Sequence, residues 1–408
     1  MFSPTKPLKF LEFVTLLAFM VSILAMSIDA MLPALGDIAI DLDVENANDT
    51  QLVVTSMFLG FALGQILAGP LSDNYGRKPV IYVGYLIFIT GCMISMVTES
   101  FFWMLFGRML QGLGAAAPRI VSIALVRDGY EGRAMARIMS VVMAIFILVP
   151  AIAPAIGQGM MLIAGWRSIF GLLLMMALAA FFWFALRQPE TLEKSARISL
   201  SGRNFLAGFK EVVSYRSTFG YTLASGALFS AFIGYLSSAQ QIFQTTYASG
   251  QWFAIYFGVA ALAIGIASVY NSSVVERLGM RFMSLRATIG LFFSSALFLF
   301  VVFIFSGVPP LWMLMTWLIV AFFCTGILFG NFNAMAMEPV GHMAGMGAAV
   351  VGSLSTLISL PLGWYIGSEF NGTVFPLVAG FVVMSAACIA IIVFIDRKPI
   401  ETKPESKI

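Results

Sequence analysis

Twelve apolar runs, each long enough to cross a lipid bilayer as a helix, recur along the whole sequence. A bilayer core about 30 Å thick needs about 20 mostly apolar residues in each helical span. Backbone polar groups inside lipid must be satisfied within the protein, and a helix does this within one segment. The sequence therefore predicts an all-α membrane protein whose twelve transmembrane helices cover residues 10–35, 51–71, 79–98, 101–125, 137–162, 166–187, 217–239, 251–273, 284–306, 311–333, 343–367 and 373–395.

The composition excludes an ordinary soluble protein. Hydrophobic residues make up 60% of the chain and charged residues only 11%, whereas soluble domains carry about 25% charged residues. The basic residues fall at helix ends and form no stripe, so nucleic acid is not an expected partner. The lipid bilayer is the expected surrounding of most of the chain.

The basic residues also predict the orientation. If the N-terminus lies in the cytoplasm, nearly every Lys and Arg falls on the cytoplasmic side, as the positive-inside rule requires. The outer side keeps Arg167, and the first outer loop is acidic, with Asp37, Asp41 and Asp43. Both termini are then cytoplasmic, and the number of spans is even.

A polar stretch in the middle of the chain divides the spans into two sets of six. We expect an N-terminal six-helix bundle over 1–187, a cytoplasmic linker over 188–216, a C-terminal six-helix bundle over 217–396 and a cytoplasmic tail over 397–408. Part of the linker, residues 197–210, is compatible with a surface helix.

A weak internal repeat relates the two halves. The second cytoplasmic loop of each half has an acid, a glycine three residues later and then a basic residue: Asp73, Gly76 and Arg77 in residues 69–78, and Glu276, Gly279 and Arg281 in residues 275–281. Two pseudo-symmetric six-helix bundles of this kind are typical of a transporter with its site between the halves, near the membrane midplane.

Several segments resemble a known family. Gly-Pro-Leu-Ser-Asp-x-x-Gly-Arg-Lys-Pro, at 69–79, resembles the signature loop of the major facilitator superfamily. Three further segments, 29–35, 108–116 and 150–157, are similar to motifs of its drug:proton antiporters in the first, fourth and fifth helices. Segments that resemble the bicyclomycin-resistance (Bcr/CflA) branch lie at 126–128, 136–140, 165–170, 333–336 and 342–345.

The resemblance implies a proton-coupled exporter of small hydrophobic or amphipathic compounds in a bacterial inner membrane. It implies energy from the proton gradient, no cofactor and a monomer. A proton-coupled exporter of one metabolite, such as an amino acid or a siderophore, is the main alternative. Two segments depart from the pattern: Gln158 follows Gly157 where a second glycine is expected, and 344–349 lacks small hydroxyl residues.

Asp29 is the expected proton-coupling acid. It lies in an apolar run that continues to Leu35, and a carboxylate in a low-dielectric setting takes up a proton more readily than one in water. The alternative is that Asp29 is solvated near the outer mouth. The resemblance adds Arg108, which matches the arginine of the fourth-helix motif and is implicated there in proton transfer.

Two other groups of residues are expected to control conformation. Asp73, Arg77 and Asp128 should form a cytoplasmic charge cluster that closes the inner mouth, in which Asp73 caps the start of span eleven, near Ala344, and Arg77 reaches Asp128. Pro150, Pro154 and Gly157 share one helix face, which predicts a bent and closely packed span. In the family this motif accompanies antiport. The alternative interpretation of both groups is purely structural.

Arg119 is a second arginine in the fourth span, about three helical turns after Arg108. A permanently charged side chain in the membrane needs an acid, carbonyl groups or water. It either lines the substrate cavity and favours anionic or zwitterionic compounds, or extends to the cytoplasmic interface. The sequence leaves both possibilities open.

Polar residues of the second half are further candidates for the cavity, because a few hydrogen-bonding groups in an apolar pocket orient a ligand. The alternative is that they satisfy neighbouring helices, and His342 is interpreted as structural. The candidates are Tyr235, Gln240, Gln241, Asn331 and Asn333.

The sequence does not contain the residue patterns that other functional classes require. Cys92, Cys324 and Cys388 lie separately in apolar runs, so neither a metal site nor a disulfide framework is expected. A phosphate-binding loop with Gly-x-x-x-x-Gly-Lys-Ser/Thr is missing, which argues against ATP coupling. A membrane enzyme would need a catalytic cluster, and a passive channel does not account for the two-half repeat.

Overall fold

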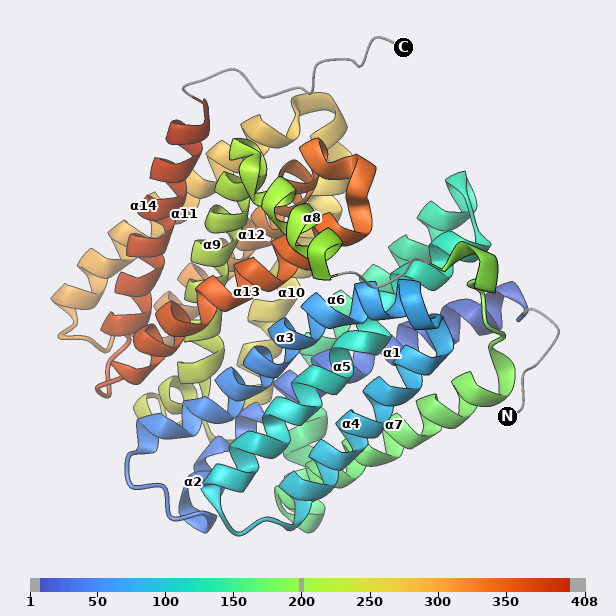
Figure 1. The fold of residues 1–408 in the computed structure, drawn as a ribbon. Coiled ribbons are helices and arrows are strands. Elements are labelled where there is room, and N and C mark those ends of the chain that lie inside the picture. The colour runs from blue at the N-terminus through green and yellow to red at the C-terminus, as the bar shows by residue number, and fades with distance from the viewer. Residues whose placement is uncertain (1–7, 198–201, 397–408) are drawn as a thin grey trace. The chain divides into compact units, whose positions relative to one another are not determined.

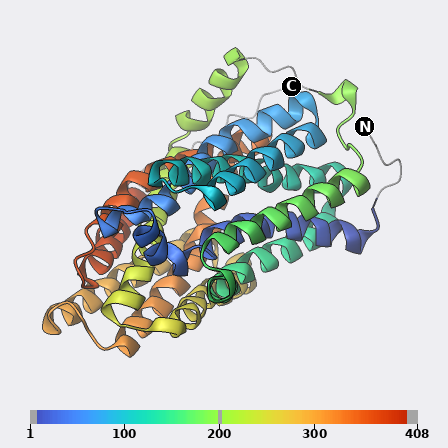
Figure 2. The ribbon, with the colours of Figure 1, turned by 90° about the horizontal axis from the view of Figure 1, so that it is seen from below.

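The computed structural model describes residues 8–197 and 202–396, and these residues form helices and connecting turns without a strand (Figures 1 and 2). The expected tail 397–408 lies outside the described residues. The α-helices are α1 (Phe10–Asp29), α2 (Leu35–Asp41), α3 (Leu52–Tyr75), α4 (Arg77–Val97), α5 (Phe101–Gly129), α6 (Gly132–Ala164), α7 (Arg167–Arg187), α8 (Gly202–Ser214), α9 (Arg216–Gln240), α10 (Phe253–Leu278), α11 (Met280–Ile304), α12 (Leu311–Met337), α13 (Ala344–Ser368) and α14 (Phe375–Asp396).

Twelve helical segments of the described chain are long and apolar enough to cross a membrane. They correspond to the twelve expected spans, so the predicted all-α fold with twelve transmembrane helices is confirmed. Two spans differ in detail. The first changes from α1 to a short 3₁₀-helix, Leu32–Ala34, and then to α2, and the seventh continues beyond α9 as a π-helix, Gln241–Thr246.

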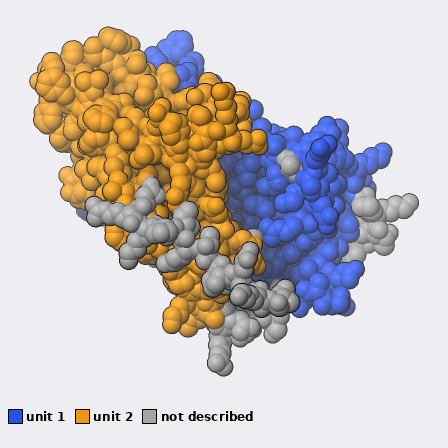
Figure 3. All heavy atoms as spheres, turned by 90° about the horizontal axis from the view of Figure 1, so that it is seen from above, with its two compact units in different colours: residues 1–200, 239–262 blue, residues 201–238, 263–408 orange. Residues whose placement is uncertain are grey.

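The chain forms two compact units (Figure 3). Unit 1 contains residues 1–200 and 239–262, and unit 2 contains residues 201–238 and 263–408. The C-terminal end of span seven and the first part of span eight therefore group with unit 1. Amide contacts account for part of this grouping: Gln241 donates to Asn48 over 2.8 Å and accepts from Gln51 over 3.3 Å.

Unit 1 is organised around α5, against which both α3 and α4 pack. Small residues permit this close packing: a Cβ on Gly112 of α5 would lie 1.8 Å from the Met57 carbonyl oxygen of α3. On the opposite side of α4, Tyr82 packs against Phe181 and Phe184 of α7 at centroid distances of 5.4 and 6.0 Å. Helices that approach through small residues are typical of membrane proteins, where van der Waals packing replaces the hydrophobic effect.

Aromatic contacts join α11, α12 and α14 in unit 2. Trp317 of α12 stacks on Phe298 of α11 at 5.1 Å and meets Phe381 of α14 edge-on at 5.3 Å. Its indole N–H donates to Ser295 over 3.2 Å, so the buried polar atom is satisfied.

The surface helix of the linker is α8, which begins at Gly202 and ends at Ser214, later than the expected range 197–210. It packs against the start of α13, where Gly208 lies beside Met346. The Nε2 atom of His342 lies 3.0 Å from a side-chain oxygen of Glu211 beside this contact, within hydrogen-bond distance. His342 is thus part of a structural contact within unit 2.

Candidate functional site

Asp29 is the last residue of α1, just before the first span changes from an α-helix to a 3₁₀-helix. Its side chain is buried, with 5% of the residue exposed. Pro33 explains the interruption, because proline lacks an N–H and continues the chain here as a 3₁₀-turn. Among the described residues, no hydrogen bond or ion pair to the Asp29 carboxylate is found. Asp29 is therefore an intramembrane acid without a cationic partner in the described part of unit 1.

The antiporter-like segment of α6 packs directly beside Asp29. A Cβ on Gly157 would lie 1.9 Å from the carbonyl oxygen of Ala30, the residue that follows Asp29. Glycine is thus required for this approach of α6 to the break in span one. Pro150 and Pro154 lie inside α6, which continues as one helix through both.

Arg108 is fully buried in α5, with an exposed fraction of 0%. Its Nε donates to the Val53 carbonyl oxygen over 3.1 Å and its Nη1 donates to the Gln111 side-chain oxygen over 2.6 Å. Both acceptors are neutral amide oxygens. Within the described chain no hydrogen bond or ion pair joins Arg108 to Asp29, so the two expected coupling residues are not in direct contact.

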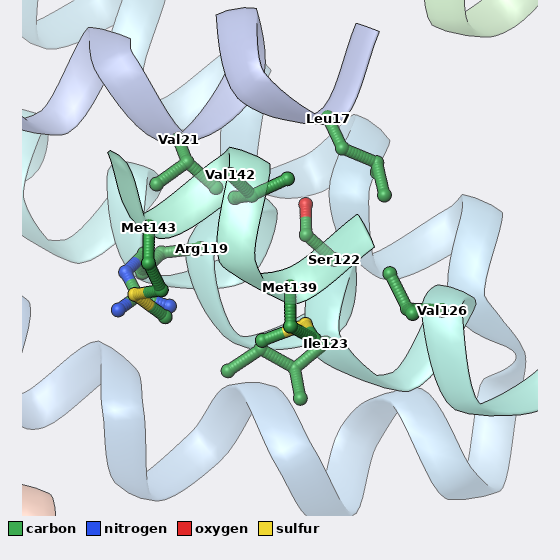
Figure 4. Close-up of a pocket in the computed structure, with 9 residues that line it drawn as sticks. All are labelled: Leu17, Val21, Arg119, Ser122, Ile123, Val126, Met139, Val142 and Met143. Carbon is green, nitrogen blue, oxygen red and sulfur yellow. The ribbon is translucent and has the colours of Figure 1, made fainter. Parts of the chain in front are cut away.

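Arg119 lies on the same helix and borders a small cavity of about 10 Å³ in unit 1 (Figure 4). The cavity is lined from α1, α5 and α6, and Ser122 is its only other polar lining residue. The guanidinium lies over the ring of Phe146, with 5.1 Å between its central carbon and the ring centroid.

Arg77 is the centre of a charge cluster at the turn between α3 and α4. Its Nε donates to Asp128 over 3.0 Å, and its Nη1 donates to Asp73 and, over 2.9 Å, to Ser72. The structure thus brings together the three residues of the expected cytoplasmic gate. The Arg77 side chain is 8% exposed, against 16% for Asp128 and 41% for Asp73.

The beginning of the linker covers this cluster. Glu190 accepts hydrogen bonds from the backbone N–H groups of Arg77 and Lys78 over 2.9 and 3.0 Å, at the first turn of α4. Lys78 donates to the Gln188 carbonyl oxygen over 2.5 Å, and Thr191 donates to Asp128 over 2.7 Å. A carboxylate at a helix N-terminus satisfies free N–H groups and favours the helix dipole.

The polar candidates of the second half are divided between the two units. Asn331 of α12 exchanges two hydrogen bonds, of 2.8 and 3.1 Å, with Asn271 of α10 in unit 2. Tyr235 is buried in unit 2 against Phe322, whereas Gln240 and Gln241 belong to unit 1. Gln240 donates to Gln244 over 2.8 Å, and Asn333 is exposed on α12.

Sequence reasoning missed several partners of these residues. Gln111 had a local signal, because it follows Arg108 by three positions and so lies on the same helix face. Glu190 had none, because it lies 113 residues from Arg77. Asn271 and the pair Asn48 and Gln51 likewise bind residues far away in the sequence.

The described residues contain no group of three or more His, Cys, Asp or Glu side chains that could hold a metal ion. The cysteines are free, and Cys92 and Cys388 are buried. The functional features of the described chain are therefore charged and amide side chains within helices.

Comparisons with known proteins agree with this arrangement. The family model described as Major Facilitator Superfamily matches residues 14–363. An uncharacterized MFS-type transporter, YdgK of Bacillus subtilis, is 30% identical over 84% of this chain and 86% of its own. A bicyclomycin resistance protein homolog of Haemophilus influenzae is 29% identical over 86% of this chain and 87% of its own. Multidrug resistance protein D of Escherichia coli is 26% identical over 84% and 85%.

Two solved structures have a similar fold at low sequence identity. The xylose transporter XylE of E. coli, in a partially occluded inward open conformation, has a TM-score of 0.72 at 12% identity and covers 97% of this chain and 99% of its own. The human organic anion transporter MFSD10 has a TM-score of 0.69 at 17% identity, with 95% and 100% covered.

Proposed function

Because the chain belongs to the major facilitator superfamily, we propose that it exports small hydrophobic or amphipathic compounds in exchange for protons. Relatives named for bicyclomycin and multidrug resistance support the choice of substrate class. The observation that carries the proposal is the buried Asp29 at the break in span one, without a cationic partner in the described residues. An intramembrane acid of this kind binds and releases protons rather than stabilising the fold.

Arg108 and the α6 motif have supporting roles in this proposal. The hydrogen bonds found for Arg108 go to neutral oxygens, so its positive charge is not neutralised by an acid. In this proposal the charge acts electrostatically on the protonation of Asp29 in the same helical bundle. Gly157 holds α6 against Ala30, which limits the space for water beside Asp29. Pro150 and Pro154 shape the same helix.

We propose that the cluster of Asp73, Arg77 and Asp128 gates the cytoplasmic side. Its hydrogen bonds must break when the helix ends separate, so they bias the equilibrium between two conformations. Gln240, Gln241, Tyr235, Asn331 and Asn333 remain candidates for the substrate cavity.

The remaining expectations form part of the same proposal. The proton gradient supplies the energy without a cofactor, and the chain catalyses no reaction. It acts as a monomer in the bacterial inner membrane, with both termini in the cytoplasm, as the distribution of basic residues predicts.

Asp29→Asn tests the proposal most directly. The amide has nearly the same shape but cannot exchange a proton, so drug-induced proton release from the purified protein should be abolished while folding is retained. The measurement uses a pH-sensitive dye in weakly buffered detergent solution. Transport of a panel of labelled compounds into liposomes with an imposed pH gradient then identifies the substrate class.

Asp37→Asn is the matched control, because Asp37 is an exposed acid of the adjoining α2. It should release protons as the wild type does. Wild-type release by Asp29→Asn would refute the coupling role. Transport of a single amino acid or siderophore, with no response to other compounds, would favour the metabolite exporter instead.

A further inference from the structure

Arg119 is an intramembrane cation to which the described residues offer no acidic partner. Arg108, on the same helix, donates hydrogen bonds to two amide oxygens. The guanidinium of Arg119 instead lies over the ring face of Phe146. A ring face carries only partial negative charge, so it compensates a guanidinium less well than an anion does. The two arginines of α5 therefore differ in an important respect: Arg108 is bound within the protein and Arg119 is available.

Arg119 lies well inside α5 and not at the end of the helix. Asp128, which binds Arg77 at the cytoplasmic end, follows Arg119 by nine residues on the same helix. With a rise of about 1.5 Å per residue, the two Cα atoms are about 13 Å apart along the axis. An arginine side chain does not reach across this distance, and the Arg119 side chain instead packs against Phe146 of α6.

The surroundings of Arg119 suit a small polar group of a ligand that is otherwise apolar. The cavity beside it has about 10 Å³, which is room for a group the size of a water molecule. Its walls are the apolar side chains of Leu17, Val21, Met139, Val142 and Met143 (Figure 4). Arg119 itself is partly exposed at the surface of unit 1, so a ligand can approach without opening the helical packing.

We propose that Arg119 binds the anionic head group, a carboxylate or sulfonate, of amphipathic compounds that this transporter carries. The guanidinium presents two parallel N–H groups that match such oxygens. The small cavity admits one of these oxygens, and the apolar body of the compound lies outside it, on the partly exposed side of Arg119. This inference rests on the proposed export function and specifies its substrate class. The same chemistry also describes a site for a small inorganic anion, and the test separates the two.

Two dyes with one skeleton provide the test. Anilinonaphthalene sulfonate and phenylnaphthylamine share their aromatic rings, and only the first carries a sulfonate. Binding of each to purified protein in lipid nanodiscs is measured by fluorescence, with empty nanodiscs subtracted. Arg119→Gln should weaken binding of the sulfonate by about tenfold or more, because a hydrogen bond to a charged group is lost. Binding of phenylnaphthylamine should stay within about twofold, which also shows that the variant is folded.

Two further variants sharpen the result. Arg119→Lys keeps the charge and should retain more sulfonate binding than Arg119→Gln. Arg127→Gln removes an exposed arginine of the same helix and should change neither affinity. An equal loss of both dyes in Arg119→Gln, or no loss of either, would overturn the inference.

Competition identifies the source of the anionic group. Benzenesulfonate should displace the bound sulfonate dye, whereas sulfate at the same ionic strength should not. Displacement by sulfate as effective as that by benzenesulfonate would indicate a site for inorganic anions and overturn the proposal. The proposed export function is tested separately, because pH-driven transport of a neutral compound by wild type and Arg119→Gln does not depend on this site.

Discussion

The turn around Gly76 in unit 1 and the turn around Gly279 in unit 2 have the same backbone. Both glycines have positive φ, +104° and +85°, and each separates two consecutive membrane helices. The N–H of Gly76 donates to the Ser72 carbonyl oxygen over 3.1 Å, and that of Gly279 to Val275 over 2.8 Å. An acid, Asp73 or Glu276, lies three residues before each glycine. The weak sequence repeat thus corresponds to a shared local structure.

The surroundings of the two turns differ completely. A Cβ on Gly76 would meet Glu190 and Arg197 of the linker at 2.7 and 2.9 Å, whereas a Cβ on Gly279 would meet nothing within 4 Å. Arg77 is buried among carboxylates, but Arg281 is exposed. The backbone turn is therefore common to both halves, whereas the cluster of Arg77 with Asp73 and Asp128, and the Glu190 carboxylate over it, belong to the first turn.

Replacing the arginine of each turn should produce the largest difference between them. Arg77→Gln leaves Asp73 and Asp128 without their cation, and breaking a mostly buried ion pair costs about 3 kcal/mol in unfolding free energy. Arg281→Gln is the matched control, and an exposed position should change stability by about 0.5 kcal/mol or less. Denaturant unfolding of both purified variants in the same mixed micelles provides the measurement. Equal losses would mean that the two turns are energetically alike.

Replacing each glycine by alanine should show a smaller difference. Positive φ strains alanine at either position by about 1–3 kcal/mol. Gly76→Ala should destabilise by about 1–2 kcal/mol more than Gly279→Ala, since its Cβ displaces Glu190 from the N–H groups of Arg77 and Lys78. Thermal unfolding of both variants measures this difference.

A Glu190→Ala background identifies the cause of that difference. Without the glutamate, the conflict with its carboxylate and the lost hydrogen bonds disappear, and the remaining neighbour is the end of the flexible Arg197 side chain. Gly76→Ala and Gly279→Ala should then become nearly equivalent. If Gly76→Ala stays more harmful in this background, the linker carboxylate is not what distinguishes the two turns.

Features set by local sequence were predictable. The apolar runs predicted the twelve spans because a helix needs a fixed length to cross lipid. The acid and arginine of the loop 69–78 predicted a charge cluster, and the structure places Arg77 against Asp128. The interruption of the α-helix after Asp29 was missed although Pro33 lies only four residues later, because proline is tolerated within many membrane helices.

Features set by distant contacts were not predictable. Glu190 reads in the sequence as an ordinary linker residue, and only the fold brings it to the first turn of α4. The pairing of Asn271 with Asn331 and the association of residues 239–262 with unit 1 depend on helix packing in the same way. The contacts of Val53 with Arg108 and of Phe146 with Arg119 were also hidden, because each joins residues of different helices.

Removing the hydroxyl of Thr191 should have the smallest effect on the first turn. Thr191 donates to the Asp128 oxygen that also accepts from Arg77 Nε, so Thr191→Val removes one hydrogen bond and leaves the ion pair in place. Because this bond is exposed, its loss should lower the unfolding free energy by about 0.5–1 kcal/mol. Thr191→Ser keeps the hydroxyl and should match the wild type in the same denaturant titration. A loss for Thr191→Val as large as that for Arg77→Gln would mean that the linker hydroxyl, rather than the guanidinium, holds Asp128 in the cluster. The first turn would then owe its difference from the second to the linker alone.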